Sequence, residues 1–236
     1  MNVVRTTGAA GVRRWSPVLV ALVCAATGCA QSVSGTPVAE SAVSVQRIAS
    51  PLAELLPDPA RFPARYPAVV LPAQAAAAAA GDLDGVGIGD AVDPAACTPP
   101  DVAPGTEPAA VAVGTDDASR ATLTVEVARN VELLSRLRDQ LHRCERITVS
   151  RAGASSTVTT VLDPTAPPGA QEAIALRRTV VPAVGGAGLT RTMQTSIGRV
   201  GDVRITVTSM IFGAGQPDTA AVDEMFATTV DSVRGS

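Results

Sequence analysis

The residues that could carry out chemistry in this sequence are few. His142 is the single histidine, and a Ser-His-Asp or Cys-His mechanism would have to use it as the base. At helical spacing it lies away from the apolar stripe of Leu134, Leu137 and Leu141, so we expect a solvated side chain near a helix end. The GxSxG, HExxH and Walker patterns are absent from the sequence. The sequence therefore predicts a protein that is not an enzyme.

An acidic segment, GDLDGVGIGDAVD at residues 81–93, is the one candidate for metal binding. Counted from Asp82, acidic residues fall at the first, third, ninth and twelfth positions and Gly87 at the sixth, as in a calcium loop. However, Val86 occupies the fifth position, and Asp93 replaces the long glutamate that binds calcium with both oxygens. We therefore expect an ordinary Asp/Gly turn here, with no metal and no cofactor.

Residues 1–28 predict a signal peptide. A basic leader without acidic residues precedes an apolar run of about 14 residues, which is too short to span a membrane but typical of secretory signals. Signal peptidases require small residues before the cut. Ala-Thr-Gly precedes Cys29, whereas the bulky Leu-Val precedes Cys24. The stretch ATGC resembles the lipobox of bacterial lipoproteins, which implies that Cys29 is acylated and begins the mature chain.

The mature chain divides into a tether and one domain. Residues 29–49 begin with CAQSVSGTPVAESAVSVQ, a small and polar run that is typical of a flexible tether. Residues 50–236 suffice for a single domain with a sizeable core. No second apolar stretch reaches membrane-spanning length, so attachment would depend on lipid at Cys29.

The charge of the mature chain argues against nucleic acid as a partner. Without residues 1–28, 16 basic side chains stand against 22 acidic ones, a net charge of −6. Proteins that bind polyanions usually carry a basic stripe instead. The aromatic residues Phe62, Tyr66, Phe212 and Phe226 are too few for stacking on bases. We expect a monomer whose partner is an envelope ligand or protein.

Alternating apolar and polar residues predict an antiparallel sheet. Residues 121–129, ATLTVEVAR, alternate between the two classes, and residues 204–212, RITVTSMIF, repeat the alternation. This pattern is typical of strands with one buried and one solvated face. Further strands are expected at residues 68–71, 146–150, 157–162, 173–181 and 190–197.

Helical spacing of apolar residues predicts helices in residues 130–144 and 217–233. One helical turn is expected at residues 52–56, and a short alanine-rich helix is expected to begin at Pro72 and to end before Gly81. Strands and helices are segregated along the chain, so we predict an α+β domain. Its antiparallel sheet should have one polar face, with the helices packed on the other.

Cys97 and Cys144 are the thiols that remain beside the acylated cysteine. Exported proteins fold in an oxidising compartment, where such a pair forms a disulfide. Cys97 lies in the proline-rich segment DPAACTPP, and Cys144 continues the apolar stripe of the helix at residues 130–144. We therefore predict one structural disulfide between Cys97 and Cys144.

The polar face of the predicted sheet is a candidate binding surface. Arg177 and Arg204 are its expected anchors, because a guanidinium offers several fixed donors to carboxylate or phosphate groups. Thr206 and Thr208 would add hydroxyl groups beside them. The alternative that the sequence leaves open is an ordinary solvated face without a ligand.

Four segments resemble known proteins. CAQSVSGTP looks like the mature N-terminus of mycobacterial lipoproteins. LLPDPARFPARYPAVVLP, GDLDGVGIGDAVDPAACTPP and VGTDDASRATLTVEVAR resemble an uncharacterised domain of such lipoproteins, which is similar to the extracellular sensor domain of mycobacterial serine/threonine kinases. The resemblance covers roughly residues 50–236 and implies an extracytoplasmic α+β domain with a cleft. That sensor domain usually has two disulfides, whereas one is possible here, and no kinase domain is present to carry a signal.

These features predict a lipid-anchored binding or sensor-like module on the outer face of the cytoplasmic membrane. A carrier of lipid or another apolar molecule is the alternative, and it would require a cavity above roughly 1,000 Å³. An enzyme is the third possibility, and no nucleophile–base pair in the sequence supports it.

The assignment of the anchor can be tested with two cysteine variants. Cys29→Ala should leave the protein uncleaved or released from the membrane, because stable attachment requires more than one acyl chain and the lipobox cysteine receives them. Cys24→Ala, the matched control, should remain anchored because this residue is removed with the leader. Detergent partitioning measures both, and loss of anchoring in Cys24→Ala would contradict the assignment.

Overall fold

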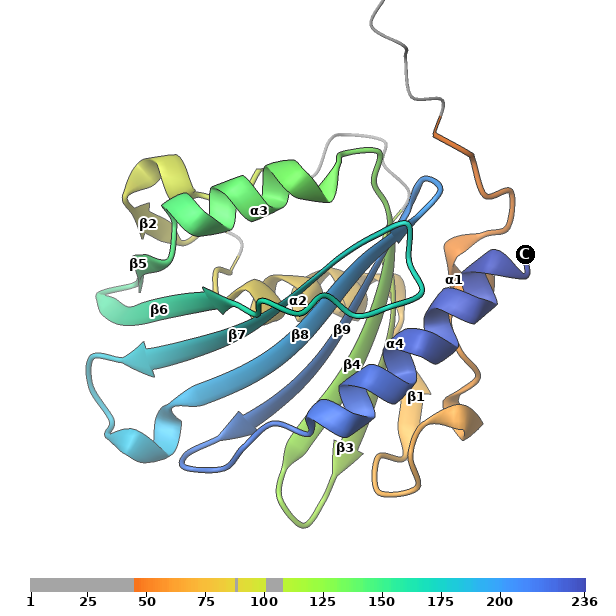
Figure 1. The fold of residues 1–236 in the computed structure, drawn as a ribbon. Coiled ribbons are helices and arrows are strands. Elements are labelled where there is room, and N and C mark those ends of the chain that lie inside the picture. Colours follow the sequence, from red (N-terminus) through yellow and green to blue (C-terminus); the bar gives the residue numbers. More distant parts are fainter. Residues whose placement is uncertain (1–44, 88, 101–107) are drawn as a thin grey trace, which may run out of the picture. The chain divides into compact units, whose positions relative to one another are not determined.

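The alternating segments of the sequence form an antiparallel sheet (Figure 1). The protein is described by a computed structural model that covers residues 45–87, 89–100 and 108–236, all within the compact unit Val43–Ser236. In these residues nine strands lie in the order β1-β3-β4-β9-β8-β7-β6-β5-β2, and all neighbours are antiparallel. The strands are β1 (Ala68–Val70), β2 (Ala91–Asp93), β3 (Ala110–Asp116), β4 (Ala121–Arg129), β5 (Arg146–Arg151), β6 (Ala154–Leu162), β7 (Glu172–Pro182), β8 (Arg191–Val200) and β9 (Val203–Phe212).

Short helices connect and cover these strands. They are α1 (Leu52–Leu55), α2 (Ala73–Asp84), α3 (Leu134–Arg143) and α4 (Thr219–Arg234), with the 3₁₀ turns η1 (Pro59–Arg61), η2 (Ala95–Cys97) and η3 (Ala187–Leu189). The α+β class, the antiparallel sheet and the helical turn after Pro51 are as predicted. None of the helices in the described part of the chain combines the length and apolar character that a membrane crossing requires.

One sheet face, named here the α4 face, carries Leu123, Val125 and Val127 of β4, all with 0% exposure. Helices α1 and α4 pack on it, and Met225 and Phe226 of α4 are 0% and 1% exposed. Full burial of an aliphatic or aromatic side chain contributes about 1.5–3 kcal/mol to folding. This face therefore holds the main hydrophobic core.

The opposite face, named the α2 face, is covered as well, which corrects the expectation of a solvated polar face. Helix α2 lies behind the sheet in Figure 1, whereas α4 lies in front. Thr124 and Thr208 are 4% and 0% exposed. The Thr195 and Thr208 hydroxyls form a hydrogen bond of 3.0 Å. In a sequence pattern, threonine counts as the polar residue of a strand with one solvated face. Its methyl group can nevertheless pack in a buried layer, where its hydroxyl finds a hydrogen-bond partner.

Helix α2 continues beyond the end predicted from the alanine run. Gly81 lies inside the helix, Asp84 is its last residue, and Gly85 with φ +70° ends it in the left-handed conformation that favours glycine. Asp82 and Asp84 therefore belong to the last turn of a helix and not to the Asp/Gly turn that the sequence predicts. Nowhere in residues 45–87, 89–100 and 108–236 do three or more His, Cys, Asp or Glu side chains form a metal-binding group.

Helix α3 begins later than the predicted residue 130. Its first residue, Leu134, donates its backbone N–H to the Glu172 carboxylate at 2.7 Å. The first N–H groups of a helix have no partner within the helix. A carboxylate from β7 thus fixes the start of α3 through a contact that a local sequence pattern cannot reveal.

The predicted disulfide is present. Cys97 in η2 and Cys144 after α3 are bonded, with a Cα–Cα distance of 5.7 Å. The bridge joins two segments on the α2 face that are 47 residues apart. In the chain-entropy model, a cross-link of this length stabilises the fold by roughly 4 kcal/mol.

Removal of the bridge should lower stability. We expect Cys97→Ala with Cys144→Ala to reduce the free energy of unfolding by about 2–4 kcal/mol, because the unfolded chain regains the entropy of the open loop. Urea titrations with and without reductant measure the effect. Reductant should destabilise the wild type and leave the double variant unchanged. Alkylation of both thiols in unreduced wild-type protein would show that the bridge does not form.

Candidate functional site

The four residues predicted as a binding site do not share one face of the sheet. Arg177 on β7 lies opposite Gln194 of β8, and Arg204 on β9 lies opposite Arg199 of β8. Gln194 and Arg199 are an odd number of residues apart on one strand, so their side chains point to opposite faces. Arg177 therefore lies on the α4 face, where it donates to Gln216 Oε1 at 2.9 Å. The pairing of the two arginines in a single site is thus corrected.

Arg204, Thr206 and Thr208 lie together on the α2 face. Thr206 and Thr208 are 9% and 0% exposed, and an Arg204 nitrogen is 3.8 Å from the Glu126 carboxylate. Burial raises the pKa of Glu126; Arg204 opposes this shift and Asp84 adds to it. A ligand on these residues stays a prediction, and it would have to reach side chains that are mostly covered.

A pocket opens on the other face, between α4 and the loop that joins β6 to β7. Figure 1 shows this loop, residues 163–171, crossing the sheet on the same side as α4. The pocket, named here the α4 groove, has a volume of about 370 Å³. It is lined by Asp163, Thr165, Ala166, Pro167, Pro168, Ala175, Gln194, Ser196, Thr219, Asp223, Phe226 and Ala227. This size is within the range of small-molecule sites and well below that expected of a lipid carrier.

The floor of the α4 groove is polar. Gln194 and Ser196 of β8 are only 6% and 2% exposed, and they line the groove. Among the described residues, neither side chain forms a hydrogen bond with protein. Neither contributes to the fully buried side-chain atoms that lack a partner in the described residues, so their polar atoms remain in contact with the solvent of the groove. These two side chains are therefore available to a ligand.

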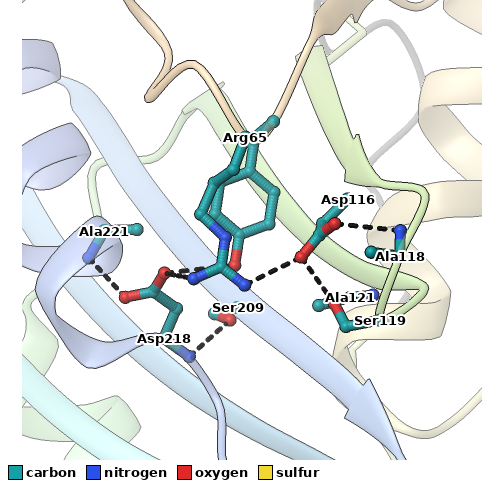
Figure 2. Close-up of polar contacts among 9 residues, drawn as sticks. Arg65, Asp116, Ala118, Ser119, Ala121, Ser209, Asp218 and Ala221 are labelled. Atoms are coloured by element: carbon teal, nitrogen blue, oxygen red, sulfur yellow. Dashed lines mark hydrogen bonds and ion pairs between the residues drawn. The ribbon is translucent and has the colours of Figure 1, made fainter.

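A network of charged groups holds the α4 wall of the groove (Figure 2). Asp218 caps the helix, accepting the Ala221 N–H at 3.0 Å, and donates its own N–H to Ser209 Oγ at 2.9 Å. Arg65 bridges Asp218, at 3.3 Å, and Asp116, at 2.7 Å. Tyr66 also donates to Asp218. The first turn of α4, which carries Thr219, is thus fixed to β9 and to the segment before β1.

Asp116 is the most perturbed carboxylate of this network. The hydrogen bond from Arg65 is the largest cause that lowers its pKa to about 2. Hydrogen bonds from the Ser119 hydroxyl and the Ala118 N–H act in the same direction. Because these donors bind the ionised carboxylate more strongly than the protonated form, the network is strongest while Asp116 is charged.

The loop of residues 163–171 forms the second wall of the groove, named here the loop wall, and backbone hydrogen bonds hold it at both ends. Asp163 donates its N–H to Ala175 O at 2.8 Å, and Gln171 donates to Arg199 O at 2.9 Å. The loop and α4 meet over Gly198 of β8. A Cβ at Gly198 would lie 2.6 Å from Phe226 and 2.9 Å from Ala170. The absence of a side chain at Gly198 therefore lets the two walls close one end of the groove.

The floor residues were not predicted from the sequence, although a signal exists. On β8 the α4 face receives Gln194, Ser196 and Gly198, whereas the neighbouring β9 places Val207 and Ile205 beside Ser196 and Gly198. Small and polar residues on a face that is otherwise aliphatic leave room above the strand. The sequence of β8 alone shows the ordinary alternation of a strand. The small and polar positions stand out only when the pairing of β8 with β9 is known.

His142 takes the solvated position that the sequence predicts. Its side chain is 58% exposed at the end of α3, and its Nδ1 is 3.8 Å from the Glu145 carboxylate. It also borders a small pocket of about 150 Å³ beside β6. Neither feature brings His142 to the α4 groove, whose lining lacks histidine and cysteine.

Comparison with solved structures finds distant neighbours, among them two mycobacterial proteins. Neither the protein-family models nor the curated proteins match this sequence. An uncharacterised Mycobacterium smegmatis protein, the Rv0999 ortholog, is 16% identical with a TM-score of 0.44, over 72% of this chain and 86% of its own. The extracellular domain of PknH from Mycobacterium tuberculosis is 13% identical with a TM-score of 0.46, over 77% and 98%. These are the kinds of protein that the sequence resembles, but at such TM-scores neither assigns a function to the groove.

The charge network predicts an acid-dependent part of stability. The pKa of Asp116 is about 2 when folded, against 3.8 as the ordinary value, so the unfolded chain binds more protons between these limits. Stability from Asp116 is therefore fully present above pH 3.8 and is lost as the pH falls toward 2. We expect Asp116→Asn to have a smaller fall in the free energy of unfolding across this window.

Denaturant titrations at several pH values measure this slope. Asp117→Asn is the matched control, since the Asp117 side chain is exposed next to Asp116. The control should keep the wild-type slope. An identical slope in wild type and Asp116→Asn would contradict the role of the network.

Proposed function

We propose that this protein is a lipid-anchored, extracytoplasmic binding module of the cell envelope, and that it holds a small polar molecule in the α4 groove. The lipobox at Cys29 supports the anchor. The Cys97–Cys144 disulfide supports an oxidising compartment, because such bridges are rare where thiols are kept reduced.

The observation that carries the binding role is the floor of the α4 groove. The side chains of Gln194 and Ser196 are almost fully buried, face a pocket of about 370 Å³ and have no hydrogen-bond partner among the described residues. A ligand that pairs with them replaces water at polar groups that the protein itself does not use. Mostly apolar walls with a few polar groups are typical of small-molecule sites.

The groove also has the rigidity that a binding site requires. One wall is a helix fixed at its N-terminus by Asp218, and the floor is a central strand of the sheet. Groups held in place before binding lose little entropy when the ligand arrives. A sensor-like role follows if occupancy of the groove is communicated to a partner in the envelope.

Substitution of the floor should separate binding from stability. In Gln194→Leu with Ser196→Ala, unpartnered polar groups become apolar, so the melting temperature should be unchanged or raised. Ligand binding should be lost, because the groove no longer offers an amide or a hydroxyl. Gln74→Leu on α2 is the matched control, since Gln74 is exposed on the opposite side of the sheet.

Native mass spectrometry of protein purified from its own host provides the measurement. The wild type and Gln74→Leu should carry a bound small molecule that is missing from the double variant. The same bound mass in all three proteins, or in none of them, would contradict the proposal.

A further inference from the structure

Each wall of the α4 groove carries a carboxylate. Asp163 lies at the start of the loop wall, and Asp223 lies on α4. Within the described residues, neither forms an ion pair with an arginine or with His142. Asp163 accepts the N–H of Thr165 at 3.0 Å through one oxygen. The groove therefore presents negative charge that the protein does not neutralise there.

No cationic side chain is among the groove's lining residues. Arg177 is not a lining residue, and its guanidinium donates to Gln216. A carboxylate or phosphate inside the groove would be repelled by two aspartates without a compensating arginine. Like charges at close range cost free energy in binding, and unlike charges steer and orient a ligand.

The floor adds a second requirement that is independent of the aspartates. The Gln194 carboxamide both donates and accepts, and the Ser196 hydroxyl does the same. These side chains are 6% and 2% exposed and have no described partner. They fit a ligand with neutral hydroxyl or amide groups close to its charged group.

We infer that the α4 groove selects a small molecule that carries a protonated amine together with hydroxyl or amide groups. The amine pairs with Asp163 and Asp223, and the neutral polar groups pair with Gln194 and Ser196. This inference rests on the proposed binding function and specifies its ligand class. The volume of the groove restricts the ligand to a molecule of one or a few sugar-sized units, such as an amino sugar.

Three sugars of similar size and different charge test the inference. Glucosamine carries an amine, N-acetylglucosamine is its uncharged acetylated derivative, and glucuronate is an anion. Their affinities are measured by NMR titration of the folded protein, followed at the Gln194 side-chain amide. Glucosamine should bind most tightly, and its affinity should fall as salt is added, because the pairs with the aspartates are partly exposed.

Charge-removing variants identify the source of the preference. Asp163→Asn keeps the acceptor for Thr165 and loses the charge, and Asp223→Asn removes the second carboxylate. Each should weaken glucosamine binding roughly two- to fivefold, in the range of a partly exposed ion pair. The affinity for N-acetylglucosamine should stay the same. Asp231→Asn, an exposed residue of α4 that does not line the groove, is the matched control.

The outcomes distinguish this inference from the binding function itself. Equal affinity for the three sugars, tighter binding of glucuronate, or no glucosamine-dependent shift would overturn the amine preference. If the wild-type protein still carries a bound mass that depends on Gln194, the binding function survives that result. If no bound mass exists, both ideas fail together. Loss of the preference in Asp231→Asn would also place its origin outside the groove.

Discussion

The carboxylate of Asp218 joins parts of the chain that are far apart in sequence. One oxygen caps α4, and the other accepts hydrogen bonds from Arg65 and Tyr66, more than 150 residues away. Tyr66 is 1% exposed, so loss of this acceptor would leave a buried hydroxyl unpaired. The position of α4 over the sheet, and hence one wall of the groove, depends on this meeting point.

Helices on both sides of the sheet divide the molecule into two different environments. On the α2 face, a helix rich in alanine covers rows of threonine, and the disulfide joins η2 to the end of α3. Some polar groups on that face are paired, such as the Thr195 and Thr208 hydroxyls, whereas the Nε atoms of Arg199 and Arg204 have no partner among the described residues. On the α4 face the core is aliphatic except beside β8, where the loop and α4 leave a pocket over Gln194 and Ser196. The polar side chains of β8 therefore interrupt the aliphatic core where the pocket lies.

The sequence predicts seven of the nine strands in the described residues, the disulfide and the α+β class, because alternation, turns and cysteine count are local or nearly local signals; it misses β2 and β3. The prediction of a solvated polar face is wrong because threonine occurs both on solvated faces of a sheet and on covered ones. The faces of Arg177 and Arg204 depend on the register of three strands across two connections, which a strand pattern does not contain. The groove depends on the same register, and also on a loop without regular structure that crosses the sheet to meet α4.

Gly198 has a consequence for the kind of molecule that can enter. Phe226 and Ala170 meet above it, so the groove beside β8 is closed at this end. A long chain cannot thread through such a channel, whereas its terminal unit can enter. If the natural ligand is part of an envelope polymer, the protein would read free chain ends and ignore the interior of the strand.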